Sequence, residues 1–464
     1  MGNRLILKFT FLFFLVALVG FISYRIGLNS QQIIALSIFS ASVLATLLFW
    51  DFRVAIAFLG VAILLITKTV DLENLVKFAS LEVILFLVGM MVLVGLLKES
   101  GLFAWLVTLI LRIRNLTAKK FVFMISITSA LLACCVDEVT SIVFMAAAIL
   151  AICDYFEVEP TPFIIISILA TNIGSTGTVL GNPIGILIAS KSGLTFEDFI
   201  FKAFPLMWIC LLITISLVML CYHKAIKRLD EQIKELGANE ILIKLISVPP
   251  ERQLKLGLTI FGITLLFIAM HHRLELLWGL ETNTLLLTIP LISAGGVMIW
   301  KHRKAREYIE KDVDWWTLLF FLLLFAKAGT LKYTQTTDVL ANRLLGLVNR
   351  NPLALTGTIL WVSAVGSSIL DNVVLVAAFI PIVQSLKDLG FALQPLWWAL
   401  LFGGCLGGNI TLVGSTANIV ALGILEKEKN IRITFFRWFW IGLFVGIATT
   451  LVVWAALLFL PFYH

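Results

Sequence analysis

The chain contains one polar pattern twice, each time inside a strongly apolar stretch. In both copies an acid and a second polar residue, first Asp137-Glu138 and then Asp371-Asn372, lie between apolar arms. About forty residues after each acid, glycine, asparagine and hydroxyl residues interrupt the next apolar segment, at 171–183 and at 407–418. A duplicated unit with paired breaks at matching positions is typical of secondary transporters built from repeats.

The composition places these repeats in a membrane. Of the 464 residues 60% are hydrophobic and only 14% are charged, whereas a soluble domain carries about a quarter charged residues. The six cysteines have no metal-ligand spacing, and we expect small buried thiols. The net charge of +7 comes from basic residues in loops and requires no nucleic acid partner. We therefore predict an all-α polytopic membrane protein.

Apolar segments of roughly 20 residues predict the helices that cross the bilayer. The arms around each acid are shorter, so we expect re-entrant hairpins at 121–153 and 355–386 with the acids at their tips. Segments 163–189 and 397–425 carry the polar breaks and are predicted to unwind there. Including these two, we expect eleven spans: 8–26, 32–50, 53–67, 80–97, 163–189, 205–222, 256–270, 284–300, 315–331, 397–425 and 437–460.

Basic residues in the loops predict the orientation. They concentrate at 223–256 and 301–311, which the positive-inside rule places in the cytoplasm. The N-terminus is then cytoplasmic, the C-terminus is outside, and the two hairpins open on opposite sides, so the repeats are inverted. Lys68 and Lys77 do not fit, because this scheme leaves them outside.

The same pattern predicts five regions along the chain. The repeats are separated by polar and linking segments and preceded by a separate group of helices. The regions are an N-terminal three-helix scaffold at 1–74, repeat 1 at 75–222, a cytoplasmic loop at 223–256, linker helices at 257–311 and repeat 2 at 312–464.

The polar side chains of the tips and breaks are candidate ion ligands. Unwound backbone survives at membrane depth only where protein or a water-filled cavity surrounds it. Small residues also allow helices to pack closely, but their recurrence downstream of both acids favours a binding site. The candidates are Asp137, Glu138, Thr140, Asn172, Thr176, Thr178, Asn182, Asp371, Asn372, Asn409, Thr411, Ser415, Thr416 and Asn418.

Ionisable residues at membrane depth usually line an ion path. We expect Asp137 and Asp371 to hold a transported or coupling cation. Glu138 either shares this role or is a structural hydrogen-bonding partner of the hairpin tip. Lys327 is a basic residue inside an apolar span, and it either neutralises an acid or extends to the membrane surface.

These motifs resemble those of the ion-transporter superfamily, which includes arsenite permeases, NhaD-type sodium/proton antiporters, the melanosomal P protein and divalent-anion/sodium symporters. The similarity runs from about residue 75 to residue 460. The resemblance implies two hairpins, two unwound helices, a site between them and often a homodimer. It is carried by VDEVTS at 136–141, ATNIGSTGTVLGNP at 170–183, DVDWWTLLFF at 312–321, SSILDNVVLVAA at 367–378 and GGNITLVGSTANIV at 407–420.

Three departures from the family pattern bear on the substrate. Arsenite permeases and P proteins tend to read GDPPN where this chain has GNPIG at 181–185, so an amide replaces an acid. Lys327 stands where relatives usually have an apolar residue. The Ser-Asn-Thr triplets of the divalent-anion symporters are absent from this sequence, which weakens a dicarboxylate interpretation.

Three candidate acids against at most one base favour a cation. We therefore predict a monovalent cation/proton antiporter, most simply of sodium against protons, in the inner or plasma membrane. The alternative is an anion or oxyanion permease of the arsenite or dicarboxylate kind, whose acids hold coupling ions. A channel does not need inverted broken repeats. An enzyme would need a nucleophile with a base, or a metal triad, and no histidine lies in the core segments of this sequence. The expected partners are a small ion, the lipid bilayer and a second copy, with no cofactor beyond a coupling sodium or proton.

Overall fold

The computed structural model describes residues 2–49, 52–102, 105–106, 108, 116–236 and 252–463, and the regular elements there are all helices. Among them, ten helices are long and apolar enough to cross a membrane. An eleventh span is reached if the bent pair Thr284–Trp300 and His302–Asp312 is counted as one. The chain is an all-α polytopic membrane protein, as the composition predicted.

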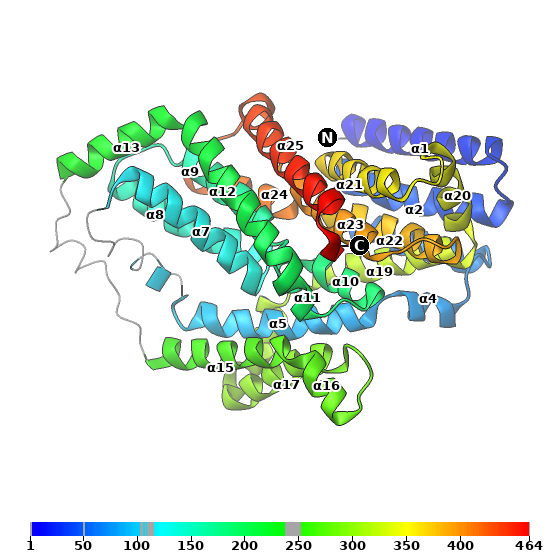
Figure 1. Cartoon of the computed structure of the whole chain (residues 1–464), viewed down its shortest axis with the longest axis horizontal. Helices are drawn as coiled ribbons and strands as arrows, with labels where there is room; N and C mark the ends of the chain where they lie inside the picture. The colour runs from blue at the N-terminus through cyan, green and yellow to red at the C-terminus, as the bar shows by residue number, and fades with distance from the viewer. Residues whose placement is uncertain are drawn as a thin grey trace.

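The N-terminal scaffold packs against the second repeat. Its second and third helices contact α19, the first helix of that repeat, and Figure 1 shows α1 and α2 at one end of the molecule. A reciprocal pair of hydrogen bonds between Asn29 and Gln32 caps the second helix. The scaffold helices are α1 (Gly2–Arg25), α2 (Ser30–Leu48) and α3 (Arg53–Ile66), and α4 (Leu72–Phe78) crosses the predicted boundary between 74 and 75.

In the first repeat two helices meet at a tight tip, and a helix is broken further along the chain. That the pair is re-entrant stays a prediction, since both arms, Ala118–Val136 and Glu138–Tyr155, are among the ten helices long enough to cross a membrane. The hairpin covers 118–155, slightly more than the predicted 121–153, and the break falls at 175–182. Asn182 caps the helix after the break, and Pro183 occupies its first position, where a missing N–H costs nothing. The helices are α5 (Leu81–Glu99), α7 (Ala118–Val136), α8 (Glu138–Tyr155), α9 (Thr161–Gly174), α10 (Pro183–Ser192), α11 (Phe196–Asp198), η2 (Phe199–Ala203) and α12 (Phe204–Cys221).

The second repeat has the same order of elements. Its hairpin covers 352–388 and its break covers 408–415. Each hairpin arm in the two repeats has 17 to 19 residues, so the arms are longer than the sequence indicated. The helices are α19 (Trp315–Tyr333), α20 (Thr336–Leu347), α21 (Pro352–Ile369), α22 (Asn372–Asp388), α23 (Gln394–Gly407), α24 (Thr416–Lys429), α25 (Phe435–Phe459) and η5 (Pro461–Tyr463).

The predicted cytoplasmic loop at 223–256 is helical over part of its length. Helix α13 (His223–Leu236) forms because the apolar side chains of Ile226, Leu229 and Ile233 are buried along one face, and the helix packs against α7 and α12. Residues 237–251 lie outside the described part of the chain. The predicted loop is therefore helical at 223–236 and from Arg252 onward.

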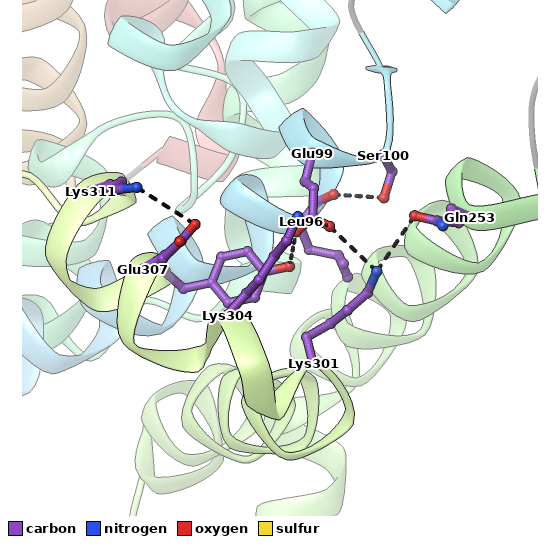
Figure 2. A network of polar contacts seen from close by, with 9 residues as sticks. Leu96, Glu99, Ser100, Gln253, Lys301, Lys304, Glu307 and Lys311 are labelled. Carbon is purple, nitrogen blue, oxygen red and sulfur yellow. Dashed lines mark hydrogen bonds and ion pairs between the residues drawn. The ribbon is translucent and has the colours of Figure 1, made fainter.

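The linker helices pack along α5, as Figure 1 shows. Glu99 at the end of α5 accepts hydrogen bonds from the Tyr308 hydroxyl at 2.5 Å and the Lys304 ammonium at 3.0 Å. Lys301 adds an ion pair at 3.5 Å (Figure 2), so the segment after α17 is fastened to α5. The linker elements are α15 (Arg252–Ala269), α16 (His271–Trp278), α17 (Thr284–Trp300), η3 (His302–Lys304), α18 (Ala305–Glu307) and η4 (Tyr308–Asp312).

The second half of each broken helix packs against the hairpin of the other repeat. Helix α24 of the second repeat packs on α8 of the first, and α10 of the first packs on α22 of the second. Within each repeat, Gly174 and Gly407 lie so close to a hairpin arm that an added Cβ would come within 2.3 and 2.1 Å of the carbonyl oxygens of Ala130 and Ala364. These glycines therefore serve helix packing.

Candidate ion-binding site

The first hairpin tip is strained. Helix α7 ends at Val136 and α8 begins at Glu138, so Asp137 alone makes the turn, with φ of +118°. A non-glycine residue in this region costs roughly 1–3 kcal/mol. The Asp137 carboxylate offsets part of that cost by capping α8, since it accepts hydrogen bonds from the Thr140 amide at 2.8 Å and hydroxyl at 2.7 Å.

The second hairpin tip is relaxed and faces another element. Asp371 has φ of −55°, an ordinary backbone conformation. Its carboxylate accepts a hydrogen bond from the Thr416 hydroxyl of α24 at 2.6 Å and from the Val373 amide at 3.1 Å. Asp371 therefore joins the second hairpin to the second broken helix, whereas Asp137 is bonded within its own hairpin.

Glu138 lies where the polar motifs of both repeats meet. Its side chain is buried, with 2% of the residue exposed. Its Oε1 accepts hydrogen bonds from Asn372 at the second hairpin tip at 3.1 Å and from Ser415 at the second break at 3.3 Å. Its Oε2 accepts from Asn182 at the first break at 3.3 Å. The acid whose role the sequence left open thus contacts three other motifs.

A buried group of three asparagines joins the two broken helices. The Asn172 amide donates to the side-chain oxygens of Asn409 and Asn418, both at 2.8 Å. Asn418 in turn donates to the carbonyls of Gly408 and Thr411, which the break has freed from helical bonds. The side-chain oxygen of Asn172 is buried and has no hydrogen-bond partner in the described part of the chain. These three residues are cross-links between repeats.

The remaining predicted threonines donate hydrogen bonds to backbone carbonyl groups. Thr178 donates to the Cys134 carbonyl at 2.5 Å, and Thr411 makes the equivalent bond to the Ser368 carbonyl. Thr176 donates to the Ile173 carbonyl of its own helix. These side chains tie each break to the adjacent hairpin or helix, so the structure separates them from the group around the acids.

A cavity of about 310 Å³, which we name the acidic cavity, opens beside the hairpin tips. Of the predicted residues, Asp137, Glu138, Thr140 and Thr416 line it. The rest of its polar wall was not predicted from the sequence, because these residues lie outside the tips and breaks. They are Arg53, Asp312, Asp314, Trp316 and Thr317.

Arg53, and not Lys327, is the base of the acidic cavity. Arg53 is 4% exposed, its guanidinium lies 3.3 Å from the Thr317 hydroxyl, and it interacts electrostatically with Asp371 and Asp314. Lys327 is 1% exposed and donates to the Ser42 hydroxyl at 2.5 Å and the Ala57 carbonyl at 3.5 Å. Both roles predicted for Lys327 are wrong, since it bonds neutral groups of the scaffold and does not reach the surface.

The acids do not form a ready-made metal centre. In the described ranges no three or more His, Cys, Asp or Glu side chains are grouped so that they could hold a metal ion. Asp137 and Asp371 bond Thr140 and Thr416, respectively. Cys405, treated as a buried thiol, lies against the site, with its sulfur 3.1 Å from the Asn182 amide nitrogen. A transported cation at the two aspartates stays a prediction.

The sequence of this chain matches a known protein family. The family described as "Citrate transporter" (CitMHS) matches residues 34–403. The chain belongs to this family. It is therefore a multi-pass membrane transporter, and the predicted resemblance to the ion-transporter superfamily is confirmed.

Similar proteins cover most of the chain. An uncharacterized transporter of Mycobacterium tuberculosis is 31% identical over 387 residues, which are 82% of this chain and 86% of the relative. The human P protein is 27% identical over 77% of this chain, which spans about half (51%) of the P protein. The YdaH transporter of Alcanivorax borkumensis has the same fold, with a TM-score of 0.53 and 16% identity over 86% of this chain and 88% of that structure.

Proposed function

We propose that this protein couples the movement of a small ion to protons through Glu138. The observation that carries the proposal is the set of three neutral donors, Asn182, Asn372 and Ser415, around one buried carboxyl group. As a carboxylate, Glu138 accepts all three hydrogen bonds; as an acid, one of its oxygens becomes a donor. A proton would thus change the bonds between the repeats and shift the balance between their arrangements.

For the cargo, we favour an anion of the carboxylate class, as the description of the citrate transporter family suggests. Arg53 supports this form, because a guanidinium presents a fork of donors that matches a carboxylate. The carboxylates would then hold the coupling proton or cation.

The sodium/proton exchange predicted from the sequence is the second candidate. It is favoured by the four carboxylates that line the acidic cavity, those of Asp137, Glu138, Asp312 and Asp314, against the single guanidinium of Arg53. One of these acids is neutralised by a residue that is not among those lining the cavity, since Lys98 pairs with Asp312 at 3.2 Å. An excess of acid remains and would attract cations.

Flux measurements in proteoliposomes separate the two forms. Citrate and a panel of dicarboxylates and oxyanions are offered under an imposed pH gradient, and sodium- or lithium-dependent proton flux is followed with a pH dye. Proton-driven anion uptake that is lost in Glu138→Gln supports the anion form. Cation-dependent proton flux without anion uptake selects the exchanger, and neither flux in wild type contradicts both.

We also propose the orientation and assembly expected from the sequence: a cytoplasmic N-terminus, an outside C-terminus, the inner or plasma membrane, and a homodimer. In a Cys221→Ser background, Ala305→Cys should label only from the cytoplasm and Ala392→Cys only from outside. Labelling of Ala392→Cys from the cytoplasm contradicts the inverted arrangement. The mass of the protein in detergent tests the dimer.

A further inference from the structure

Two adjoining cavities lie apart from the acidic cavity. Their volumes are about 260 and 670 Å³, and both are lined by Lys191, Lys332 and Gln384. Lys77 lines the smaller one and Lys387 the larger one. We name this pair of cavities the lysine vestibule. It brings together side chains from α4, α10, α19 and α22, so it is a product of the tertiary fold and not of one basic segment.

The lysine vestibule has an excess of positive charge. Lys191 pairs with Glu82 at 2.9 Å, and Asp388 lines the larger cavity. Among the described residues, the other three lysines have no carboxylate within ion-pair distance. Four ammonium groups therefore face two carboxylates. The positive-inside rule assigns this face to the outside and left Lys77 unexplained there, whereas an anion-attracting surface accounts for it.

The vestibule adjoins the acidic cavity by one helical turn on three helices. Each helix presents a residue to the acidic cavity and the residue four positions later to the smaller vestibule cavity. Residues four apart lie on the same helix face, about 6 Å along the axis. The pairs are Pro183 and Leu187 on α10, Phe321 and Phe325 on α19, and Val373 and Ala377 on α22.

The pair on α19 contributes one aromatic ring to each space. The rings of Phe321 and Phe325 stack with their centroids 6.0 Å apart and their planes 19° apart. Phe321 faces the acidic cavity, and Phe325 faces the vestibule. A substrate that moved from one space to the other would pass these rings.

We propose that the lysine vestibule binds a multiply charged carboxylate at the outer face, before this anion passes the two phenylalanine rings into the acidic cavity. This inference rests on the anion form of the proposed function. Lysines gathered around one cavity concentrate such anions through their summed field. Arg53 then receives the anion beyond the rings.

Uptake of labelled citrate tests the vestibule as part of the route. The double variant Lys332→Gln/Lys387→Gln, assayed in right-side-out vesicles, should raise the apparent KM about 10-fold and leave the maximal rate unchanged. High salt should reduce the difference, because exposed charges are screened. The matched control is Lys224→Gln/Lys427→Gln, which removes two exposed lysines assigned to the other face. Equal KM values in the double variant and the control would overturn the proposal.

Thiol labelling tests the vestibule without transport. In a Cys221→Ser background, Gln384→Cys is treated with anionic and cationic methanethiosulfonate reagents of similar size. The anionic reagent should react about 10-fold faster, the preference should disappear with the two lysine substitutions, and citrate should slow the labelling. No preference, or one that citrate leaves unaltered, overturns the vestibule. Preference and protection in a protein that transports no anion overturn the anion form and leave the vestibule as an anion site.

Discussion

The two hairpin tips occupy equivalent places in the repeats but differ in chemistry. The first carries Asp137-Glu138 on a strained turn, and the second carries Asp371-Asn372 on a relaxed one. Glu138 and Asn372 follow their aspartates directly and bond each other across the two repeats at 3.1 Å. Two glutamates here would repel each other, and two asparagines would carry no proton. Divergence of one position in a duplicated scaffold has therefore produced a complementary pair, an acceptor and a donor.

Neutralising the acceptor should have the largest effect. Glu138→Gln keeps the volume but removes the exchangeable proton, so proton-driven transport should fall by on the order of 100-fold and lose its pH dependence. The exchanged double variant Glu138→Asn/Asn372→Glu should recover part of the rate if the pair itself is what matters. Both are measured as flux in proteoliposomes at equal protein content. Unchanged coupling in Glu138→Gln would end the distinction between the two tips.

The two aspartates should respond differently. Asp371→Asn weakens the bond from the second hairpin to Thr416, a charged hydrogen bond of about 1.5–3 kcal/mol, so transport should fall by roughly 10-fold or more. Thr416→Val removes the same bond from the other side and should give a similar loss. Asp137→Asn should reduce transport less, because its partner Thr140 is in the same hairpin. Equal losses at both aspartates would favour the expectation that both hold a cation.

The asparagine cross-link should contribute stability shared by both repeats. Asn172→Ala removes two buried hydrogen bonds and should cost about 1–3 kcal/mol. Thermal unfolding in detergent measures the change. The control is the neighbouring Thr171→Val, whose buried hydroxyl has no hydrogen-bond partner in the described ranges. A similar loss of stability in both variants would indicate that packing, and not the cross-link, is what the position provides.

The smallest effect should report the strain itself. At φ of +118°, Asp137→Gly should be more stable than Asp137→Ala by about 1 kcal/mol, since glycine adopts this conformation without a penalty. At the relaxed tip the order should reverse, with Asp371→Ala more stable than Asp371→Gly by roughly 0.4–1 kcal/mol. Unfolding temperatures of the four variants give both differences. The same order at both tips would mean that the turns do not differ in strain.

The sequence predicted the parts that repeat and missed the parts that only packing brings together. Glycines, acids and amides recur in order, so the hairpins, the breaks and most polar groups could be found. Arg53 could not, because an arginine at the start of an apolar helix also fits a membrane-surface anchor. The order of importance of Asp137 and Glu138 depends on where α8 begins, since a shift of one residue turns a side chain by about 100°.

Lys327 shows that the sequence also cannot tell which group a buried charge will contact. Its apolar surroundings in the sequence indicated a functional charge, but the direction it faces depends on how α19 packs against α2 and α3. The helix turns it toward Ser42 and Ala57 of the scaffold, away from the acids. A charge within an apolar segment therefore marks burial, and only the fold decides its partner.

The packing of each second half-helix on the other repeat has a consequence for protein synthesis. Helix α8 leaves the ribosome with its packing partner α24 still some 270 residues from completion, which is on the order of 15–50 s of translation at ordinary rates. During that interval Glu138 lacks Asn372 and Ser415 and retains only Asn182 among its three donors. Insertion or quality-control machinery must therefore shield a nascent chain of this protein until its last third is synthesised. Truncations that end before α24 should be degraded rather than accumulate.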